Sequence, residues 1–307
     1  MPPGVSVDDR IYDGVLDLVG RTPLLRLPRL SPRQGAEVCG KLERNNAAGS
    51  VKDRPALEMI QQAEREGTIA AGATIIEATS GNTGISLAMI AAVRGYRCVL
   101  VMPEDMSTAR RQILRAYGAE VVLTAAQEGM SGAVERAERI LRDTPNSFMP
   151  RQFRNPANPR AHHGTAEEIW RATAGRIDVF VAGVGTGGTL TGVGRTLKAR
   201  NPDLKVIAVE PRGSAVLSGG KPGLHGIQGL GAGFVPEVLD RGIIDEIITV
   251  TDLAADRMTR RLAREEGLLL GPSAGANVHV AVEVARRMSA GQRIVTILCD
   301  GGERYLC

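Results

Sequence analysis

The sequence predicts an α/β fold with two open, twisted, mostly parallel sheets flanked by helices. Short apolar runs of strand length alternate with amphipathic stretches of helix length along most of the 307 residues. This alternation is typical of parallel strands joined by crossover helices that cover both faces of a sheet. A polar, proline-containing stretch at 152–159 interrupts the alternation. It predicts a junction between two sheets of roughly equal size.

The expected elements follow in chain order. In the first half we expect strands at 74–78, 98–102 and 120–124, followed by helices at 83–94, 108–117 and 132–142. In the second half we expect strands at 179–182, 206–209, 247–250 and 294–298, with helices between them. Ligands of such folds bind beyond the carboxyl ends of the strands, so the strand-to-helix turns are the places to search.

Composition excludes several classes of protein. The chain has 37 glycines and 3% aromatic residues, and its net charge of +4 comes from arginines interspersed with glutamates on helical faces. This pattern disfavours nucleic-acid binding. The four cysteines form no CxxC pair and the four histidines are scattered, so we expect free thiols, solvated or capping histidines and no metal site. No apolar run suits a signal peptide or a membrane span, which predicts a cytoplasmic protein.

Three glycine-containing turns each open a predicted helix. We call 79–84 (TSGNTG) the first turn, 183–189 (GVGTGGT) the second turn and 271–277 (GPSAGAN) the third turn. Free backbone N–H groups at a helix N-terminus bind anions. The first and second turns occupy matching places in the two halves. They therefore predict two anions, such as the phosphate of a small cofactor and the carboxylate of an amino acid.

The second turn also admits a different interpretation. Gly183, Gly185 and Gly188 fit the dinucleotide pattern G-x-G-x-x-G, and the next strand ends in Glu210, where a ribose-binding acid would lie. An NAD site is therefore an alternative for this turn alone. It is disfavoured because a dehydrogenase would have no use for the first turn or for the lysine described next.

Lys52 lies where a helix is expected to begin. Ser50 is predicted to cap that helix, and Asp53 completes a capping box of the form S-x-x-D. Lys52 would then lie in the first helical turn, at the positive end of the helix dipole, where a cation is disfavoured. This position favours the neutral amine that a Schiff-base or proton-transferring lysine requires. An ordinary surface lysine at a helix start is the alternative.

Taken together, these segments resemble the cysteine synthase (O-acetylserine sulfhydrylase) family of tryptophan-synthase-β-like, fold-type II enzymes that use pyridoxal 5'-phosphate (PLP). The matching segments span nearly the whole chain in the family's order: 19–24 (VGRTPL), 50–54 (SVKDR), 77–84 (EATSGNTG), 152–159 (QFRNPANP), 183–189, 227–234 (IQGLGAGF), 271–275 and 302–306 (GERYL).

The resemblance implies a role for each matching residue. Lys52 would carry PLP as an aldimine and shuttle the α-proton, Asn82 would bond the phenolic oxygen, and Ser273 would face the pyridine nitrogen. The phosphate would be held by Gly185, Thr186, Gly187, Gly188 and Thr189. The substrate carboxylate would be held by Thr79, Ser80, Gly81, Thr83 and Gln152.

The resemblance also implies the reaction and the domains. The reaction would form L-cysteine from O-acetyl-L-serine and sulfide by β-replacement through an aminoacrylate. A smaller, mobile substrate-binding domain would comprise 45–155, and a larger PLP-phosphate domain would comprise 1–44 and 156–307, with the cofactor in the cleft between them. A homodimer and an acetyltransferase tail are the implied protein partners.

The chain departs from the family pattern in several places. Ala47 replaces a frequent proline, the stretch 162–169 is one residue shorter than usual, and many relatives continue past the position of Cys307. The segment 89–96 and the pair Cys299-Asp300 resemble the B-type isozyme, whereas 218–223 and 227–234 resemble the A-type.

Other reactions remain as alternatives. The same chemistry could use another donor, such as O-phosphoserine, with Arg212 or Lys221 as the added cation near its leaving group. It could also use thiosulfate, homocysteine or hydroxyurea as the nucleophile. A serine or threonine dehydratase and a non-catalytic scaffold are the remaining alternatives. The joint presence of Lys52, Asn82 and Ser273 disfavours the scaffold.

Overall fold

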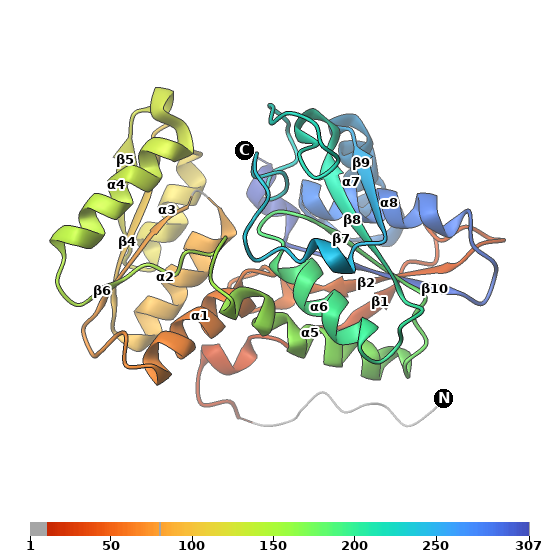
Figure 1. Cartoon of the computed structure of the whole chain (residues 1–307), viewed down its shortest axis with the longest axis horizontal. Coiled ribbons are helices and arrows are strands. Elements are labelled where there is room, and N and C mark those ends of the chain that lie inside the picture. Colours follow the sequence, from red (N-terminus) through yellow and green to blue (C-terminus); the bar gives the residue numbers. More distant parts are fainter. Residues whose placement is uncertain (1–10, 80, 307) are drawn as a thin grey trace.

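The predicted α/β architecture is confirmed by a computed structural model that describes residues 11–79 and 81–306. Figure 1 shows two sheets side by side, with the smaller sheet on the left and the larger sheet on the right. Every strand predicted from the sequence is present, with ends displaced by two residues or fewer.

The larger sheet has six strands in the order β1-β2-β10-β7-β8-β9. The strands are β1 (Leu24–Arg26), β2 (Glu37–Leu42), β7 (Val179–Gly183), β8 (Lys205–Pro211), β9 (Glu246–Val250) and β10 (Arg293–Leu298). Only the β1–β2 pair is antiparallel among these neighbours. The carboxyl ends of β7 and β10, which precede the second turn and the Cys299 segment, therefore lie at one edge.

The smaller sheet has four parallel strands in the order β5-β4-β3-β6. The strands are β3 (Thr74–Ala78), β4 (Arg97–Pro103), β5 (Glu120–Thr124) and β6 (Ser147–Phe148). The expectation of two sheets of roughly equal size is wrong. Two N-terminal strands, β1 and β2, cross to the larger sheet and pair beside β10, a contact that local sequence patterns do not reveal.

Helices cover both faces of each sheet, as the continuous burial of central strands such as β3 and β8 requires. The helices are α1 (Asp53–Arg65), α2 (Asn82–Arg94), α3 (Thr108–Ala116), α4 (Gly129–Asp143), α5 (Ala157–Thr173), α6 (Gly188–Lys198), α7 (Asp252–Glu266) and α8 (Pro272–Ala285). On the smaller sheet, α1, α2 and α3 pack on one face and α4 on the other. On the larger sheet, α5 and α6 oppose α7 and α8.

Local signals explain several helix ends. The Thr251 hydroxyl caps α7 by accepting from Ala254 N, and Pro272 begins α8, where its missing N–H costs nothing. Gly95 and Gly267 end α2 and α7 in the left-handed conformation, with φ of +70° and +71°.

Helix α1 joins the two halves of the molecule. It packs on α2 of the smaller sheet and also along α5, which covers the larger sheet (Figure 1). Lys52 immediately precedes α1, so this joint positions the predicted catalytic lysine. None of the helices within 11–79 and 81–306 is long and apolar enough to cross a membrane.

Candidate active site

Lys52 lies between the start of α1 and the end of β10. Val51 N donates to Cys299 O at 2.8 Å, and Ser50 forms a β-bridge with Asp300. Within the described chain, the Lys52 side-chain amine makes no hydrogen bond or ion pair, and the side chain is only partly buried. A lysine held by its backbone with a free amine can react with a ligand.

The predicted capping box is wrong. Helix α1 begins at Asp53, and Ser50 Oγ accepts from Lys52 N at 3.2 Å. The Asp53 carboxylate instead accepts from Ala48 N at 2.6 Å and from the Ser86 hydroxyl on α2. Burial raises the pKa of Asp53 to about 6, although both hydrogen bonds oppose the rise. The sequence pattern failed because a tertiary contact with α2 takes the carboxylate that would have closed the box.

The first turn connects β3 to α2. Thr79 and Thr83 are buried, Gly81 precedes α2, and Ser80 lies outside the described residues. The Thr83 hydroxyl donates to Gln152 Oε1 at 2.6 Å, so two predicted carboxylate-binding residues do meet. An added Cβ at Gly81 would contact nothing within 4 Å, which leaves this turn open.

A buried glutamate that sequence reasoning missed connects this turn to Gln152. Glu77 on β3 accepts from Arg151 N at 2.9 Å, and the backbone of Gln152 also donates to it. Burial raises the pKa of Glu77 to about 7, against the lowering effect of these bonds. Arg151 has a φ of +54°, an unusual value for a residue with a side chain. Glu77 therefore holds the bend that turns Gln152 toward Thr83.

Asn82 is bound at both ends by the C-terminal segment. Its Nδ2 donates to Asp300 Oδ2 at 2.6 Å, and its Oδ1 accepts from Arg304 at 2.5 Å. The Tyr305 hydroxyl also donates to Asp300 Oδ2. The family resemblance implies a place for Asn82 beside the cofactor, but the sequence did not predict these neighbours, because they come from more than 200 positions further along the chain.

The second turn connects β7 to α6 and is closely packed. A Cβ on Gly185 would lie 2.2 Å from Gly229 O, and a Cβ on Gly188 would lie 1.9 Å from Asn158 Oδ1. Gly187 adopts a φ of +83°, which favours glycine. In the described chain, the amides of Gly185, Thr186 and Gly187 donate no hydrogen bond. They remain available to an anion at the N-terminus of α6.

Buried polar side chains support the second turn from behind. Thr186 Oγ1 accepts from Asn158 Nδ2 at 3.0 Å and from Gly188 N at 3.3 Å. Thr189 Oγ1 lies 3.1 Å from Nε2 of His162, which is buried on α5. The expectation that the histidines are solvated or capping is therefore wrong for His162. Its exposed neighbour His163 fits the solvated alternative.

Ser273 lies at the start of α8 and is buried. A Cβ on Gly229, which has a φ of +91°, would approach Ser273 Oγ to 4.0 Å. The absence of a side chain at Gly229 therefore leaves room in front of Ser273. Burial raises the pKa of the neighbouring Cys299 thiol to about 11, which makes this thiol a poor nucleophile.

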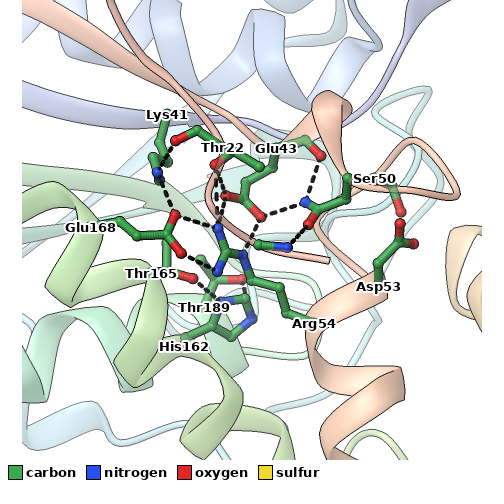
Figure 2. Close-up of polar contacts among 12 residues, drawn as sticks. Thr22, Lys41, Glu43, Ser50, Asp53, Arg54, His162, Thr165, Glu168 and Thr189 are labelled. Carbon is green, nitrogen blue, oxygen red and sulfur yellow. Dashed lines mark hydrogen bonds and ion pairs between the residues drawn. The ribbon is translucent and has the colours of Figure 1, made fainter. Parts of the chain in front are cut away.

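Figure 2 shows a buried ionic cluster around Arg54, in the first turn of α1. Arg54 donates to both oxygens of Glu43 (2.7 and 2.9 Å) and of Glu168 (2.9 and 2.7 Å). Lys41 on β2 pairs with Glu168 at 2.6 Å. The two cations balance the two carboxylates, which makes burial of all four tolerable. The cluster fixes the first turn of α1 against β2 and α5.

The buried Glu210 excludes the NAD alternative. It accepts from Leu217 N at 2.8 Å, from Ser218 N at 2.9 Å and from the Ser218 hydroxyl. Both carboxylate oxygens hold the loop after β8, so the residue that a ribose would need is already occupied.

The residues present fit PLP. The free amine of Lys52 suits an aldehyde, and the unpartnered amides at the N-terminus of α6 suit a phosphate. The small buried hydroxyl of Ser273, which also contacts the Cys299 thiol, suits a ring nitrogen. The first turn follows β3, the second turn follows β7, the Cys299 segment follows β10, and the third turn opens α8 after α7.

Comparisons with known proteins identify the family of this chain. Residues 15–300 match the family model described as "Pyridoxal-phosphate dependent enzyme". A "Probable cysteine synthase" of Bacillus subtilis is 52% identical over 301 residues, covering 97% of both chains. The crystal structure of a cysteine synthase from Entamoeba histolytica superposes with a TM-score of 0.95 at 42% identity, covering 100% of this chain and 92% of that one. An O-ureido-L-serine synthase gives 0.94 at 46% identity, covering 97% and 94%.

Proposed function

The chain belongs to the pyridoxal-phosphate dependent enzyme family, and from that premise we propose that it forms L-cysteine from O-acetyl-L-serine and sulfide. One observation carries the proposal. Hydrogen bonds join the segments that carry the free amine of Lys52, the unpartnered amides of the second turn and the Thr83–Gln152 pair. Asn158 Nδ2 donates to Gln152 O and to Thr186 Oγ1. Asn277 contacts Gly183 N and the Cys299 thiol, and Cys299 O accepts from Val51 N. Relatives named cysteine synthase at about half identity support this choice of reaction.

The cofactor supplies an electron sink for the bond changes at the substrate's α- and β-carbons. Lys52, Asn82 and Ser273 would hold it, together with the second-turn residues Gly185, Thr186, Gly187, Gly188 and Thr189. Ser273 offers a neutral hydroxyl rather than a carboxylate, so it does not keep the pyridine nitrogen protonated. That choice favours departure of a β-substituent over a long-lived carbanion.

Lys52 is the proposed acid–base group. Its amine removes the proton from the substrate's α-carbon and returns it after the nucleophile has added. The backbone bonds at Val51 and the ionic cluster at Arg54 hold Lys52 on both sides in the chain. The backbone of Lys52 is therefore fixed, while its side chain can move to transfer the proton.

We propose that the substrate's carboxylate is bound by Thr79, Ser80, Gly81, Thr83 and Gln152. Because the Thr83 hydroxyl donates to Gln152 Oε1, the Nε2 donor of Gln152 remains for the substrate. Binding there would draw 45–155 toward the larger domain, 1–44 and 156–307, and exclude water. This domain division, the homodimer, the cytoplasmic location and an acetyltransferase tail as partner belong to the same proposal.

An assay for L-cysteine tests the proposal. Purified protein with PLP is expected to consume O-acetylserine and sulfide with equimolar cysteine formation, and Lys52→Ala is expected to lose at least about a thousandfold in rate. Parallel reactions with O-phosphoserine as donor and hydroxyurea as nucleophile compare the alternatives. Arg212 and Lys221 are both exposed, so no preference for phosphoserine is expected. A faster reaction with either alternative partner would contradict the proposal.

A further inference from the structure

His162 is a buried titratable group that the proposed reaction does not use. It lies on α5 with 1% of its surface exposed, between two threonine hydroxyls. Its Nδ1 is 3.2 Å from Thr165 Oγ1, and its Nε2 is 3.1 Å from Thr189 Oγ1 (Figure 2). Thr189 belongs to the second turn, so the imidazole connects α5 with the N-terminus of α6.

The imidazole is neutral. Burial holds the pKa of His162 well below its usual range, and the nearby charges of Arg54 and Lys52 lower this pKa further. A neutral ring carries one N–H donor and one lone-pair acceptor. The two threonines must therefore receive opposite kinds of hydrogen bond.

Thr165 decides which nitrogen carries the proton. Its hydroxyl is fully buried and, among the described residues, has no hydrogen-bond partner except His162 Nδ1. A buried hydroxyl proton without an acceptor is costly, so Thr165 donates to Nδ1. The ring proton is then on Nε2, and Nε2–H donates to Thr189 Oγ1.

Thr189 is thereby left with a proton to donate. Its oxygen already accepts from His162, and no acceptor for its hydroxyl lies in the described chain. The side chain is half-buried in the first turn of α6, beside the free amides of the second turn. An anion at this turn is the acceptor that completes the chain Thr165 → His162 → Thr189 → anion.

We propose that His162 is a positioning residue that orients the Thr189 hydroxyl toward the cofactor phosphate. The second turn has neutral polar side-chain contacts from Asn158, His162 and Asn277. A phosphate there relies on oriented neutral donors and the helix N-terminus, which makes the direction of each hydroxyl important. The inference rests on the proposed function, because it assumes that the second turn holds the phosphate.

A purely structural role is the competing explanation. A Cβ on Gly192 of α6 would lie 2.8 Å from His162 Cβ, so α5 and α6 pack tightly there. If His162 only fills space, its replacement should act independently of Thr189. If it acts through Thr189, removing both side chains should cost no more than removing one.

The test measures PLP binding to apoprotein and the ³¹P NMR shift of the reconstituted protein. His162→Phe and Thr189→Val are each expected to weaken PLP binding about tenfold, the value of one hydrogen bond to a charged group, and to move the ³¹P signal. The double variant is also expected to be about tenfold weaker rather than about a hundredfold. His162→Gln retains a side-chain N–H and should recover most of the affinity. The exposed neighbour is the matched control, so His163→Phe should change nothing.

The outcomes separate the two claims. The role of His162 is overturned if the double variant binds PLP about a hundredfold more weakly than the wild type. It is also overturned if Thr189→Val weakens binding while His162→Phe keeps a normal affinity and ³¹P shift. Normal binding by Thr189→Val also overturns the inference, whereas normal binding by Gly185→Ala overturns the assignment of the phosphate to the second turn. If His162→Phe does not fold, Thr165→Val replaces it in the test. This variant removes the hydroxyl that donates to His162 Nδ1, so it should weaken PLP binding about threefold and move the ³¹P signal. No change in Thr165→Val contradicts the inference.

Discussion

The first and second turns occupy the same place in the topology, but the contacts that hold each turn in place differ. Each follows the carboxyl end of a parallel strand and opens a helix. The second turn is fixed by close backbone contacts and by the buried side chains of Asn158 and His162. At the first turn, Gly81 has open space around it, and the Thr83–Gln152 pair reaches across to another segment. This contrast fits the proposed roles, because a cofactor held throughout the reaction suits a rigid turn, whereas a substrate that enters and leaves suits an adaptable one.

The largest expected effect comes from adding a methyl group to each turn. Gly185→Ala would place Cβ 2.2 Å from the backbone oxygen of Gly229, so we expect at least about a hundredfold weaker PLP binding and a lower melting temperature. Gly81→Ala meets no atom within 4 Å, so folding and cofactor binding should stay normal. Cofactor content and thermal unfolding of the purified variants measure both effects. Equal behaviour of the two variants would remove the contrast between the turns.

A second expected effect concerns the ionic cluster that connects α1 with α5. Glu168→Gln leaves Arg54 and Lys41 short of one buried negative charge and should lower the free energy of unfolding by about 3 kcal/mol. Glu167→Gln is the control, because Glu167 forms a half-exposed pair with Arg200, and it should cost about 0.5 kcal/mol or less. Denaturant unfolding at pH 7 measures both variants.

The same glutamate predicts a dependence on acid. Burial alone would raise the pKa of Glu168, but hydrogen bonds and charges from Arg54 and Lys41 outweigh burial and lower the pKa to about 2. Because the folded pKa lies below the unfolded value, this stabilisation is present above about pH 4.5 and is lost as pH falls toward 2. Glu168→Gln should therefore lose less stability than the wild type over that range. Parallel profiles would contradict the assigned ion pairs.

A smaller effect, with the opposite sign, is expected for Glu77 beside the first turn. Its folded pKa of about 7 lies above the unfolded value, so the stability it contributes is present below about pH 4.5 and is lost as pH rises through 7. Between pH 5 and pH 8, the wild type should lose about 2 kcal/mol relative to Glu77→Gln. Glu138→Gln, which removes a surface partner of Arg151, is the control and should follow the wild type. A pH-independent difference between the wild type and Glu77→Gln would show that Glu77 does not titrate in this range.

Most of the fold could be predicted from the sequence because it depends on local periodicity. The strands at 74–78 and 120–124 were found with their observed limits, since short apolar runs bounded by turns mark them. The unequal sizes of the sheets could not be predicted. The pairing of β2 with β10 joins segments about 250 positions apart, and no local pattern specifies such a partner.

The candidate site shows the same division. Lys52 and the glycine turns could be proposed as site residues because reactive or anion-binding groups have recognisable local patterns, and Ser273 was proposed from the family resemblance. The supporting residues Glu77, His162 and Asp300 were missed, because their roles arise only from side chains that tertiary folding brings to them. The false capping box at Ser50 has the same origin, since Ser86 takes the carboxylate of Asp53.

The central claim is that Lys52 binds PLP, whose phosphate lies at the second turn, and transfers the substrate's α-proton. The visible absorption spectrum tests this claim most directly. The purified protein should absorb near the wavelength of Lys52-bound PLP, shift its absorption on addition of O-acetylserine, and return to the starting spectrum when sulfide is added. Lys52→Ala should lack both the starting band and the sulfide-driven return. A wild-type protein that stays colourless with PLP, or a Lys52→Ala variant with the full wild-type cycle, would contradict the account.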